Sequence, residues 1–524
     1  MTIHFGTDGW RAVIADTFTF DNLRLVTQGV ADAVSSSDWG TLGAPRANGT
    51  GPLNTAQPRP GAARQPAASP DDGSSPSAEG EGPREGVRFD PRLMVVGFDT
   101  RFLSDRFAVE VARVLAANGF RVMLTHSDAP TPAVSYAVKH AGAAGGVMIT
   151  ASHNAPRYNG LKLKAAYGGS ALPEQCRRVE LFLTDNETRA RGPNLMDYDQ
   201  AVRAGLLTRF NPNLAYAEQL HKLIDFDVIA NHPQRVVVDS MYGSGRGVIK
   251  GLLQGTGCEV TEIRGEMNPG FGGVHPEPIA KYLGATAGAI AAGHGSLALV
   301  TDGDADRTGA MDGRGQFVDP HKIMALTLQY LVEKRGWRGA VVKTVSTTRM
   351  VNRLAEKYGL PCYETPVGFN HIADHMLAGD VLIGGEESGG ISIRGHIPEG
   401  DGVLMGLLLL EIVAASGATL EELVAELLRA VGPAHYARTD LRLALPIAKA
   451  DMTRRLTQQA PGAIDGRRVA SVEQLDGVKY ILDDDSWLLI RPSGTEPVLR
   501  VYAEGRDEAT VKALLAFGEG VAKG

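Results

Sequence analysis

Cysteine is scarce in this sequence, with three cysteines among 524 residues. They stand far apart, at Cys176, Cys258 and Cys362, and neither their odd number nor their spacing fits a disulfide framework or a zinc site. Structural disulfides belong to oxidising compartments and are rare in the cytosol. The cysteine usage therefore predicts a protein of a reducing compartment.

Long apolar runs are also missing. A helix that spans a bilayer needs roughly 20 apolar residues, and the longest candidate, GVLMGLLLLEIVAASG at 402–417, is interrupted by Glu411. The first residues, MTIHFGTDGW, contain no basic segment followed by an apolar core, as a secretory signal would. We therefore expect a soluble, cytoplasmic protein without a membrane partner, in which 402–417 forms a buried helix.

An excess of positive charge is the third feature that the chain lacks. Its 53 basic and 60 acidic residues give a formal charge of -7, whereas a nucleic-acid-binding protein needs a basic stripe to neutralise phosphates. Nucleic acid is thus not an expected partner, although small phosphorylated ligands, which need only a few local cations, are compatible with this charge. A hydrophobic content of 43% is ordinary for globular proteins, and the length predicts three or four domains.

Residues 36–85 differ in composition from the rest of the chain. They are rich in proline, glycine, alanine and serine, and Trp39 is their only aromatic residue. Such a segment cannot bury enough apolar surface to offset the entropy of ordering. We predict a flexible insertion, either a tolerated surface loop or an interaction segment, between a helix at 20–36 and a strand at 92–99.

Elsewhere short β-rich runs alternate with helical patterns, which indicates βαβ units and mostly parallel sheets. Three such units cover 93–126, 235–264 and 339–367, whereas the tail from about 435 has the strand and helix order of an α+β domain. The predicted fold class is therefore α/β, with three related mixed α/β sheet domains and a C-terminal α+β domain.

Four apolar runs end in polar loops: GVMIT leads into ASHN, LALV into TDGDADR, DVLIGG into EESGG, and WLLI into RPSGTEP. In open α/β sheets, ligands bind beyond the carboxyl ends of the strands. One such loop in each expected domain predicts a single central cleft that all four domains line.

The loop TDGDADRTG carries Asp302, Asp304 and Asp306 at alternate positions. Carboxylates this close repel one another unless a cation lies between them, and hard oxygen ligands select Mg²⁺ or Ca²⁺. An EF-hand is excluded because its sixth position is Arg307 and its twelfth is Gly313. We predict a metal site, with a solvated acidic turn as the alternative, and Arg307 would suit a phosphate oxygen beside the metal.

Two further loops fit a phosphorylated sugar. In RPSGTEP, a guanidinium, two hydroxyls and accessible amides form a compact candidate site for an anion; these groups belong to Arg491, Ser493, Gly494 and Thr495.

In GGEESGG, Glu386 and Ser388 stand between glycines and suit sugar hydroxyls. Arg11 in FGTDGWRA is another candidate phosphate contact, and the serine loop holds Ser152 and Lys162. Together these parts predict phosphoryl transfer on a sugar phosphate.

The four motifs, in this order, resemble those of the α-D-phosphohexomutase family: TASHNAPRYNGLKLK, DGDADR, GEESGG and RPSGTEP. The resemblance covers nearly the whole chain outside 36–85. Within the family, FGTDGWRAVIA and GEESGGISIRGHIPEGDG resemble the phosphoglucomutase branch. Glu387 stands where phosphomannomutase/phosphoglucomutase enzymes usually have methionine and phosphoglucosamine mutases glutamine.

The resemblance implies roles for the residues of these loops. Ser152 would be phosphorylated and, through its phosphate, would bind Mg²⁺ together with Asp302, Asp304 and Asp306. Lys162 would assist proton transfer, and Arg11 and His153 would line the same site. The implied substrate contacts are Arg307, Glu386, Ser388, His396, Arg491, Ser493, Gly494 and Thr495, with a purely structural histidine as the alternative for His396.

The resemblance further implies a phosphoglucomutase that interconverts α-D-glucose 1-phosphate and glucose 6-phosphate through a glucose 1,6-bisphosphate intermediate. Its four domains would be a phosphoserine domain at 1–205, a metal-binding domain at 206–313, a sugar-binding domain at 314–434 and a phosphate-binding domain at 435–524. The protein would be a monomer or homodimer. Alternatives are a phosphomannomutase or phosphoglucosamine mutase, a glucose 1,6-bisphosphate synthase, and a non-catalytic sugar-phosphate-binding protein.

Two positions depart from the family pattern. Ala155 stands where proline is common, and we expect little effect because Pro156 follows and the spacing from Ser152 to Lys162 is intact. In TPVGFNHI, Asn370 stands where many relatives have lysine, and His371 is a candidate to take over that lysine's role.

Overall fold

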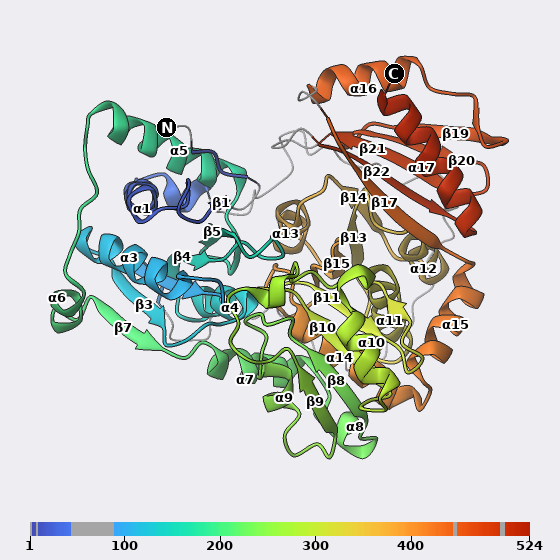
Figure 1. Ribbon diagram of the computed structural model, residues 1–524, viewed down its shortest axis with the longest axis horizontal. Coiled ribbons are helices and arrows are strands. Elements are labelled where there is room, and N and C mark those ends of the chain that lie inside the picture. Colours follow the sequence, from blue (N-terminus) through green and yellow to red (C-terminus); the bar gives the residue numbers. More distant parts are fainter. Residues whose placement is uncertain (1–2, 7–8, 43–87, 444–447, 493–497, 524) are drawn as a thin grey trace, which may run out of the picture.

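The computed structural model describes residues 3–6, 9–42, 88–443, 448–492 and 498–523. These residues form four β-sheets with associated helices, and Figure 1 shows the N-terminal part (blue) and the C-terminal part (red) on opposite sides of the molecule. The predicted class, three mixed α/β sheets followed by an α+β region, is confirmed.

The first sheet has the strand order β1-β5-β4-β2-β3-β7, with β6 paired to β5. Its strands are β1 (Gly9–Val13), β2 (Asp90–Phe98), β3 (Arg121–Thr125), β4 (Ala143–Ile149), β5 (Tyr158–Ala165), β6 (Gly169–Ser170) and β7 (Leu207–Phe210). Its helices are α1 (Phe20–Val34), α2 (Trp39–Leu42), α3 (Ser104–Ala117), α4 (Thr131–His140), α5 (Pro173–Thr188) and α6 (Tyr198–Arg203). β5 runs antiparallel to both β1 and β4, so it carries its side chains back past the serine loop.

The second sheet has the order β12-β11-β10-β8-β9. Its strands are β8 (Arg235–Asp239), β9 (Glu259–Ile263), β10 (Leu297–Thr301), β11 (Thr308–Met311) and β12 (Phe317–Val318). The helical segments around it are α7 (Asn213–Leu223), α8 (Phe226–Asn231), α9 (Val248–Leu252), α10 (Gly284–Ala291) and the 3₁₀ turns η1 (Phe271–Gly273) and η2 (Ala280–Tyr282). β7 joins the first sheet and β12 the second, although they follow the domain boundaries expected after residues 205 and 313.

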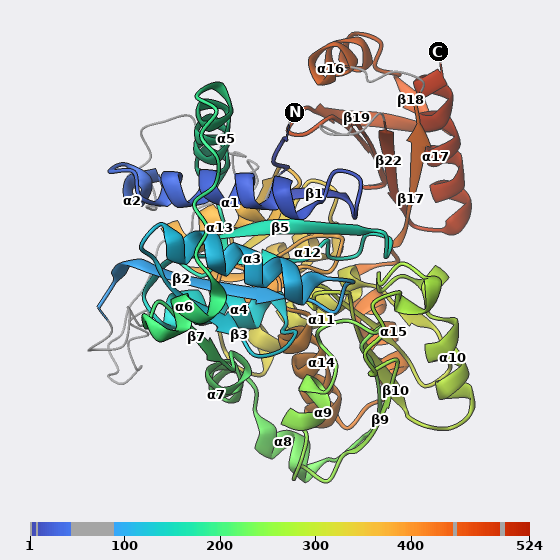
Figure 2. The same cartoon turned by 60° about the vertical axis from the view of Figure 1, so that its left-hand side comes forward.

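The third sheet has the order β14-β13-β15-β16, and the fourth, β17-β22-β21-β20-β19-β18, is antiparallel throughout. The third sheet and its helices comprise β13 (Ala340–Thr344), β14 (Cys362–Thr365), β15 (Val381–Gly385), β16 (Ile391–Ile393), α11 (Pro320–Glu333), α12 (Met350–Tyr358), α13 (Phe369–Ala378), α14 (Gly402–Ser416) and α15 (Leu420–Val431). The fourth comprises β17 (His435–Arg442), β18 (Ala463–Ile464), β19 (Arg467–Glu473), β20 (Val478–Leu482), β21 (Trp487–Pro492), β22 (Val498–Gly505), α16 (Lys449–Gln458) and α17 (Glu508–Lys523). Figure 2 shows α17 lying against this last sheet.

The three predicted βαβ units are present. β2 pairs parallel with β3, β8 with β9, and β13 with β14. A parallel pair needs a crossover connection, which α3, α9 and α12 supply in turn. The apolar runs are continuous rather than alternating because these central strands are covered on both faces.

The predicted buried helix at 402–417 is α14, and its residues from Gly402 to Ala414 are buried. It lies in the largest apolar core, which the second and third sheets share, and contacts β10, β11 and β16. Glu411 is buried within it and accepts hydrogen bonds from Arg335 and Tyr330. Among the described residues no single helix is long and apolar enough to cross a membrane; α14 and α15 together pass on length and composition, but they are bent by 87°.

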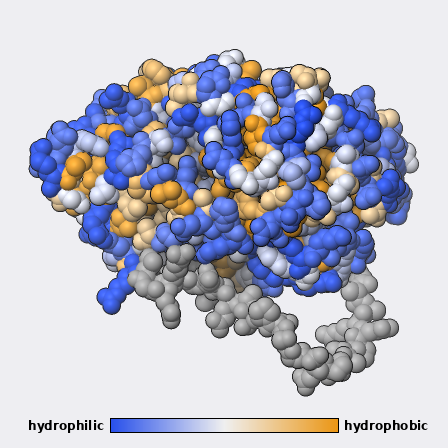
Figure 3. Space-filling model, turned by 90° about the horizontal axis from the view of Figure 1, so that it is seen from below, coloured by the Kyte–Doolittle hydropathy of each residue, from blue (hydrophilic) through white to orange (hydrophobic). Residues whose placement is uncertain are grey.

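The structure describes the first residues of the segment predicted as an insertion. Residues 36–42 include α2, and Trp39 packs into the first core and donates from Nε1 to the carbonyl of Ala144 at 3.3 Å. The flexible start predicted for these residues is therefore wrong, because the indole ring buries enough apolar surface to order them. Residues 43–87 lie outside the described residues. On the face drawn in Figure 3, hydrophilic residues cover most of the surface, with small groups of hydrophobic residues between them.

Candidate active site

The serine loop follows β4, a central strand of the first sheet. Ser152 is 1% exposed and has a φ of 51°, a left-handed conformation that is uncommon for a residue other than glycine. Its amide donates to Thr150 Oγ1 at 2.8 Å, which stabilises this turn. Such strained backbone is typical of functional sites, where the surrounding structure holds it in place.

Arg101 braces the serine loop from the next strand of the sheet. Its buried guanidinium donates to the carbonyls of Ser152, Asn154, Ala155 and Tyr158. The positive charge is balanced by Asp99, at 3.1 Å, and lies over the Phe271 ring. No motif in the sequence singled out this arginine, although Asp99 and Arg101 follow the carboxyl end of β2 as the other polar loops follow their strands.

The aspartate loop follows β10 and lies directly against the serine loop. Ser152 Oγ donates to Asp302 Oδ2 at 3.0 Å. Between the aspartates, Gly303 permits this approach, because a Cβ atom there would lie 2.5 Å from the carbonyl oxygen of Ser152. The structure thus joins two of the predicted loops, which are 150 residues apart in the chain.

Lys162 on β5 joins the same cluster. Its Nζ donates to Asp304 Oδ2 at 2.8 Å and to Asp306 Oδ2 at 2.7 Å. The lysine is 2% exposed, so its ammonium charge is neutralised inside the protein by these two carboxylates. Asp304 Oδ2 also accepts from Thr131 Oγ1, on α4, at 2.7 Å.

The negative charges of the three aspartates repel one another. Burial and the charges of Asp306 and Asp304 raise the pKa of the Asp302 carboxyl well above its ordinary value. Burial alone would also raise the pKa of Asp304, but the Lys162 ammonium holds it below its ordinary value. The positive charges nearby therefore do not fully compensate the carboxylate of Asp302. A bound cation would supply the missing positive charge.

The residues of this cluster fit a divalent metal. One oxygen from each of Asp302, Asp304 and Asp306 lies within 4.8 Å of the other two. Asp304 Oδ1 and Asp306 Oδ1 are buried and accept no hydrogen bond from the described part of the chain. The donors are all hard oxygen atoms, as Mg²⁺ prefers.

Three other predicted residues surround this centre. Arg11 on β1 pairs with Gly160 of β5, and its Nη1 donates to Asn154 Oδ1 at 3.5 Å. Burial and the charges of Arg307 and Arg11 lower the pKa of His153 well below its ordinary value, so its imidazole is neutral at pH 7. His153 Nδ1 lies 3.2 Å from Ser152 Oγ.

The predicted sugar loop follows β15. Its backbone contacts the second domain, where the amide of Thr308 donates to the Gly389 carbonyl at 3.1 Å. Glu386 Oε1 accepts from the Gly368 amide at 3.0 Å. Burial and the neighbouring Glu387 raise the pKa of the Glu386 carboxyl to about 8. Ser388 lies in the same turn, and Glu387 accepts from Ser346 Oγ at 2.6 Å.

Of the predicted phosphate loop, the structure describes Arg491 on β21; Ser493, Gly494 and Thr495 lie outside the described residues. Arg491 Nε donates to Asp476 Oδ2 at 2.6 Å. The same oxygen accepts from the Val367 amide at 3.1 Å, so the C-terminal sheet is joined to the third one beside this arginine. Asp476 was not among the predicted site residues, because it stands in an ordinary polar turn.

His396 lies in a buried cluster with Asp401 and Tyr216. Its Nε2 is 2.9 Å from Asp401 Oδ2, and Tyr216 donates to the same carboxylate. The side chain is fully buried, which favours the structural alternative for this residue.

Asn370, which stands where many relatives have lysine, lies at the start of α13, next to the sugar loop. Asn370 is 4% exposed, and its Oδ1 accepts no hydrogen bond from the described residues. Burial lowers the pKa of His371, so a neutral imidazole would not replace the charge of a lysine. His371 therefore remains a candidate only for a proton-transfer role.

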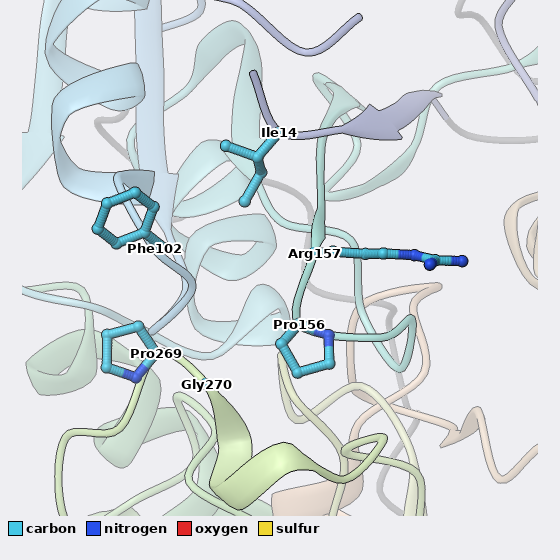
Figure 4. Close-up of a pocket in the computed structure, with 6 residues that line it drawn as sticks. All are labelled: Ile14, Phe102, Pro156, Arg157, Pro269 and Gly270. Carbon is cyan, nitrogen blue, oxygen red and sulfur yellow. The ribbon is translucent and has the colours of Figure 1, made fainter. Parts of the chain in front are cut away.

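A surface hollow of about 410 Å³ borders the serine loop (Figure 4). It is lined by Ile14, Phe102, Pro156, Arg157, Pro269 and Gly270. Arg157 extends away from Phe102 in this view, and no carboxylate lines the hollow. The candidate active site is therefore the cluster of Ser152, Lys162 and the aspartates rather than this hollow. A hydroxyl beside a carboxylate cluster that could hold a cation, with a separate guanidinium and a further carboxylate suited to hydroxyl groups, is suited to phosphoryl transfer.

Four family models match this chain. The model "Phosphoglucomutase/phosphomannomutase, alpha/beta/alpha domain I" matches residues 89–190, and domain II of the same series matches residues 214–315. Domain III matches residues 319–431, and the C-terminal domain matches residues 449–517.

Relatives with different names are similar to the chain over most of their length. A phosphoglucomutase/phosphomannomutase of Thermococcus kodakarensis is 30% identical over 81% of this chain and 89% of its own length. A phosphoglucomutase of Komagataeibacter xylinus is 29% identical over 80% and 82%. A phosphoglucosamine mutase of Moorella thermoacetica is 30% identical over 82% and 90%.

Among solved structures, one from Thermus thermophilus, named provisionally as a phosphomannomutase, superimposes with a TM-score of 0.77. It is 33% identical in sequence, and the match covers 100% of both chains. The similarity in fold therefore extends over all four domains.

Proposed function

Because the chain belongs to the α-D-phosphohexomutase family, whose members are intramolecular phosphotransferases of the isomerase class, we propose that it interconverts α-D-glucose 1-phosphate and glucose 6-phosphate. The observation that carries this proposal is the hydrogen bond from Ser152 Oγ to Asp302 inside the aspartate cluster. Glucose as the sugar is supported by the Glu386–Ser388 sequence of the phosphoglucomutase branch and by the similarity to the Komagataeibacter xylinus phosphoglucomutase.

In the proposed reaction, phosphorylated Ser152 gives its phosphoryl group to the unphosphorylated hydroxyl of the bound sugar phosphate. The bond from phosphorus to Ser152 Oγ breaks and a bond from phosphorus to the sugar oxygen forms. The Lys162 ammonium gives a proton to the departing Ser152 Oγ and takes up the proton of the sugar hydroxyl. The product is glucose 1,6-bisphosphate. It turns over in the cleft and returns its other phosphoryl group to Ser152, and the proton returns to the sugar oxygen that is released.

Asp302, Asp304 and Asp306, together with a phosphate on Ser152, would hold Mg²⁺. When bound, Mg²⁺ supplies positive charge that stabilises the transferring phosphoryl group. The protein's own cations contribute to the same end: Arg307 and Arg11 flank the centre, and Arg101 holds the Ser152 carbonyl in place. Most of the rate enhancement would come from positioning and electrostatics rather than from covalent chemistry by other residues.

The far end of the substrate would be held by two other domains. Glu386 and Ser388 would bind sugar hydroxyls in either orientation, and Arg491 with Ser493, Gly494 and Thr495 would bind the phosphate that does not react. This division of work follows the proposed domains, 1–205 for phosphoserine, 206–313 for metal, 314–434 for sugar and 435–524 for phosphate.

The second candidate is a sibling activity on mannose or glucosamine phosphates, which the similarity to the Moorella thermoacetica phosphoglucosamine mutase supports. These activities differ from the proposed one at C2 of the sugar. Whichever substrate is preferred, the phosphoryl-transfer centre would be the same.

One assay separates these candidates. The purified protein is incubated with Mg²⁺, a trace of glucose 1,6-bisphosphate and, in parallel, glucose 1-phosphate, mannose 1-phosphate or glucosamine 1-phosphate. We expect the highest kcat/KM for glucose 1-phosphate, and a higher value for another sugar would overturn the glucose assignment. Ser152→Ala serves as the control and should lower turnover by at least about 1,000-fold; full turnover by this variant would exclude the phosphoserine mechanism.

A further inference from the structure

The carboxylate of Asp476 occupies an unusual position between two domains. It stands just before β20 in the C-terminal sheet, is 2% exposed, and accepts hydrogen bonds from Arg491, Lys449 and the amide of Val367. Gly477, with a φ of 91°, brings this turn against β21, since a Cβ atom there would lie 2.4 Å from the Ile490 carbonyl oxygen. Burial alone would raise the pKa of the Asp476 carboxyl, but Arg491 and Lys449 hold it below its ordinary value, so it is ionised at neutral pH.

Two consecutive amides of the third domain bind two different carboxylates. The Val367 N–H donates to Asp476 Oδ2 at 3.1 Å, and the Gly368 N–H donates to Glu386 Oε1 at 3.0 Å. These amides stand on either side of one Cα atom, so a shift of the 367–368 backbone moves both bonds together. Asp476 is therefore linked to Glu386 through a single residue.

Asp476 also sets the orientation of Arg491. The bond at 2.6 Å comes from Nε, and Arg491 lies near the end of β21, just before Pro492. A guanidinium held through Nε by a charged acceptor keeps its plane fixed, and its two terminal nitrogens carry the remaining donors. The same carboxylate thus touches the candidate phosphate contact and the loop that positions the candidate sugar contact.

We propose that Asp476 is a positioning residue that couples the phosphate-binding end of the cleft to the sugar-binding carboxylate Glu386. This role rests on the proposed function, because it assumes that Arg491 and Glu386 bind the same substrate molecule. Binding of a phosphate by Arg491 then favours the loop position in which Glu386 faces the sugar. The two ends of the substrate are recognised jointly rather than independently.

The test is a double-mutant cycle read by ligand binding. Calorimetry gives the dissociation constants of Asp476→Asn, Glu386→Gln and the double variant for whichever of glucose, mannose and glucosamine 6-phosphate binds the unaltered protein most tightly. The matched control is Asp485→Asn, in the same domain. Asp485 also joins the C-terminal and third domains, through Arg349 and Arg353, but contacts neither Arg491 nor the 367–368 loop.

We expect Asp476→Asn to weaken binding about ten-fold, as for the loss of a charged hydrogen-bond acceptor. The double variant should bind at least about three-fold more tightly than the product of the two single fold-changes in the dissociation constant predicts. For the control pair, Asp485→Asn and Glu386→Gln, the double variant's dissociation constant should agree with the product of the single fold-changes within about two-fold. The proposal would be overturned if the fold-changes in the dissociation constant of Asp476→Asn and Glu386→Gln simply multiplied in the double variant, or if Asp476→Asn bound as tightly as the unaltered protein. A wrong sugar assignment would appear in the turnover assay instead.

A second variant covers the case in which Asp476→Asn does not fold. Val367→Pro removes the N–H that reaches Asp476 and leaves the bond between Asp476 and Arg491 in place. It should weaken binding of the sugar phosphate in a manner non-additive with Glu386→Gln, and leave the affinity for inorganic phosphate within about two-fold. Additive effects of Val367→Pro and Glu386→Gln would contradict the coupling.

Discussion

Two buried lysines on one strand show how a single residue acquires a role. Lys162 and Lys164 both lie on β5 and point to the same face, because side chains two apart in a strand share a face. Lys162 meets Asp304 and Asp306, whereas Lys164 pairs with Glu399, which also accepts from Ser135 and Ser170. Each pairs a buried ammonium group with carboxylates, but of the two only Lys162 lies in the proposed phosphoryl-transfer centre.

Lys162→Met and Lys164→Met should therefore separate stability from catalysis. Each variant leaves buried carboxylates without their cation and should lower the free energy of unfolding by about 3 to 5 kcal/mol. We expect Lys162→Met to lower kcat/KM at least about 100-fold and Lys164→Met to change it by only a few fold. Denaturant unfolding and turnover well below the unfolding midpoint provide the two measurements, and an equal loss of turnover in both variants would remove the special role of Lys162.

Glu386 makes stability depend on pH. Its pKa of about 8 means that the folded protein binds a proton that the unfolded chain has already released, so the group favours folding at low pH. Between about pH 5 and 8 this contribution falls by up to about 1.4 kcal/mol per pH unit, because the folded protein keeps this carboxyl protonated while the unfolded chain has released the proton. Glu386→Gln should flatten the fall and Ser388→Ala should not. Unfolding curves at pH 5.5, 6.5 and 7.5 test this, and identical slopes in Glu386→Gln and the unaltered protein would contradict it.

Individual elements follow the local sequence closely. The helix expected at 20–36 is α1, the strand at 92–99 is β2, and the alternation of short apolar runs with helical patterns gives the three parallel pairs. These signals are local, because periodicity and chain-breaking residues act within a few positions. Within the βαβ unit expected at 235–264, the connecting helix α9 is short, Val248–Leu252, because Gly247 and Gly255 adopt positive φ on either side.

The bracing of the serine loop by Arg101 is a contact between elements that no local pattern announces. Lysine at this position could reach fewer of the four carbonyls, because it lacks the fork of the guanidinium. We expect Arg101→Lys to lower kcat/KM at least about ten-fold and the free energy of unfolding by about 3 kcal/mol.

The control for Arg101→Lys is Arg24→Lys. Arg24 forms ion pairs with Glu110 and Asp21 near the surface, so its replacement should cost less than about 1 kcal/mol and leave turnover unchanged. Turnover and denaturant unfolding of both variants decide the matter. Normal turnover by Arg101→Lys would mean that the loop holds its shape without this arginine.

At the scale of the whole molecule, contacts between successive domains bring described parts of the chain together. Ser152 meets Asp302, the Thr308 amide meets Gly389, and Val367 meets Asp476. Each contact joins one domain to the next among the described residues, and the single cleft lined by all four loops stays a prediction. A cation at the aspartates would therefore act on the first two domains together.

Removal of divalent cations tests this at the same scale. We expect EDTA to stop turnover and added Mg²⁺ to restore it, because the charge on the transferring group is otherwise uncompensated. Mg²⁺ at about 100 times its dissociation constant should stabilise the fold by about 2.7 kcal/mol, seen as a higher Tm. Asp304→Asn should lose this shift, and Asp484→Asn, a surface carboxylate in the C-terminal domain, should keep it. Turnover that persists in EDTA would exclude the metal role.

The sequence by itself determined which chemical groups follow which strands, because strand and loop signals are local and the four motifs can be read within a few residues each. It led to the class of fold, the aspartate cluster and Ser152. Only the tertiary structure decided that Arg101 holds the serine loop, that Lys162 neutralises two aspartates 142 and 144 residues away, and that Asp476 joins Arg491 to the loop of Glu386. Such contacts depend on how separate elements pack, and packing brings together residues whose partners no local pattern of the chain specifies.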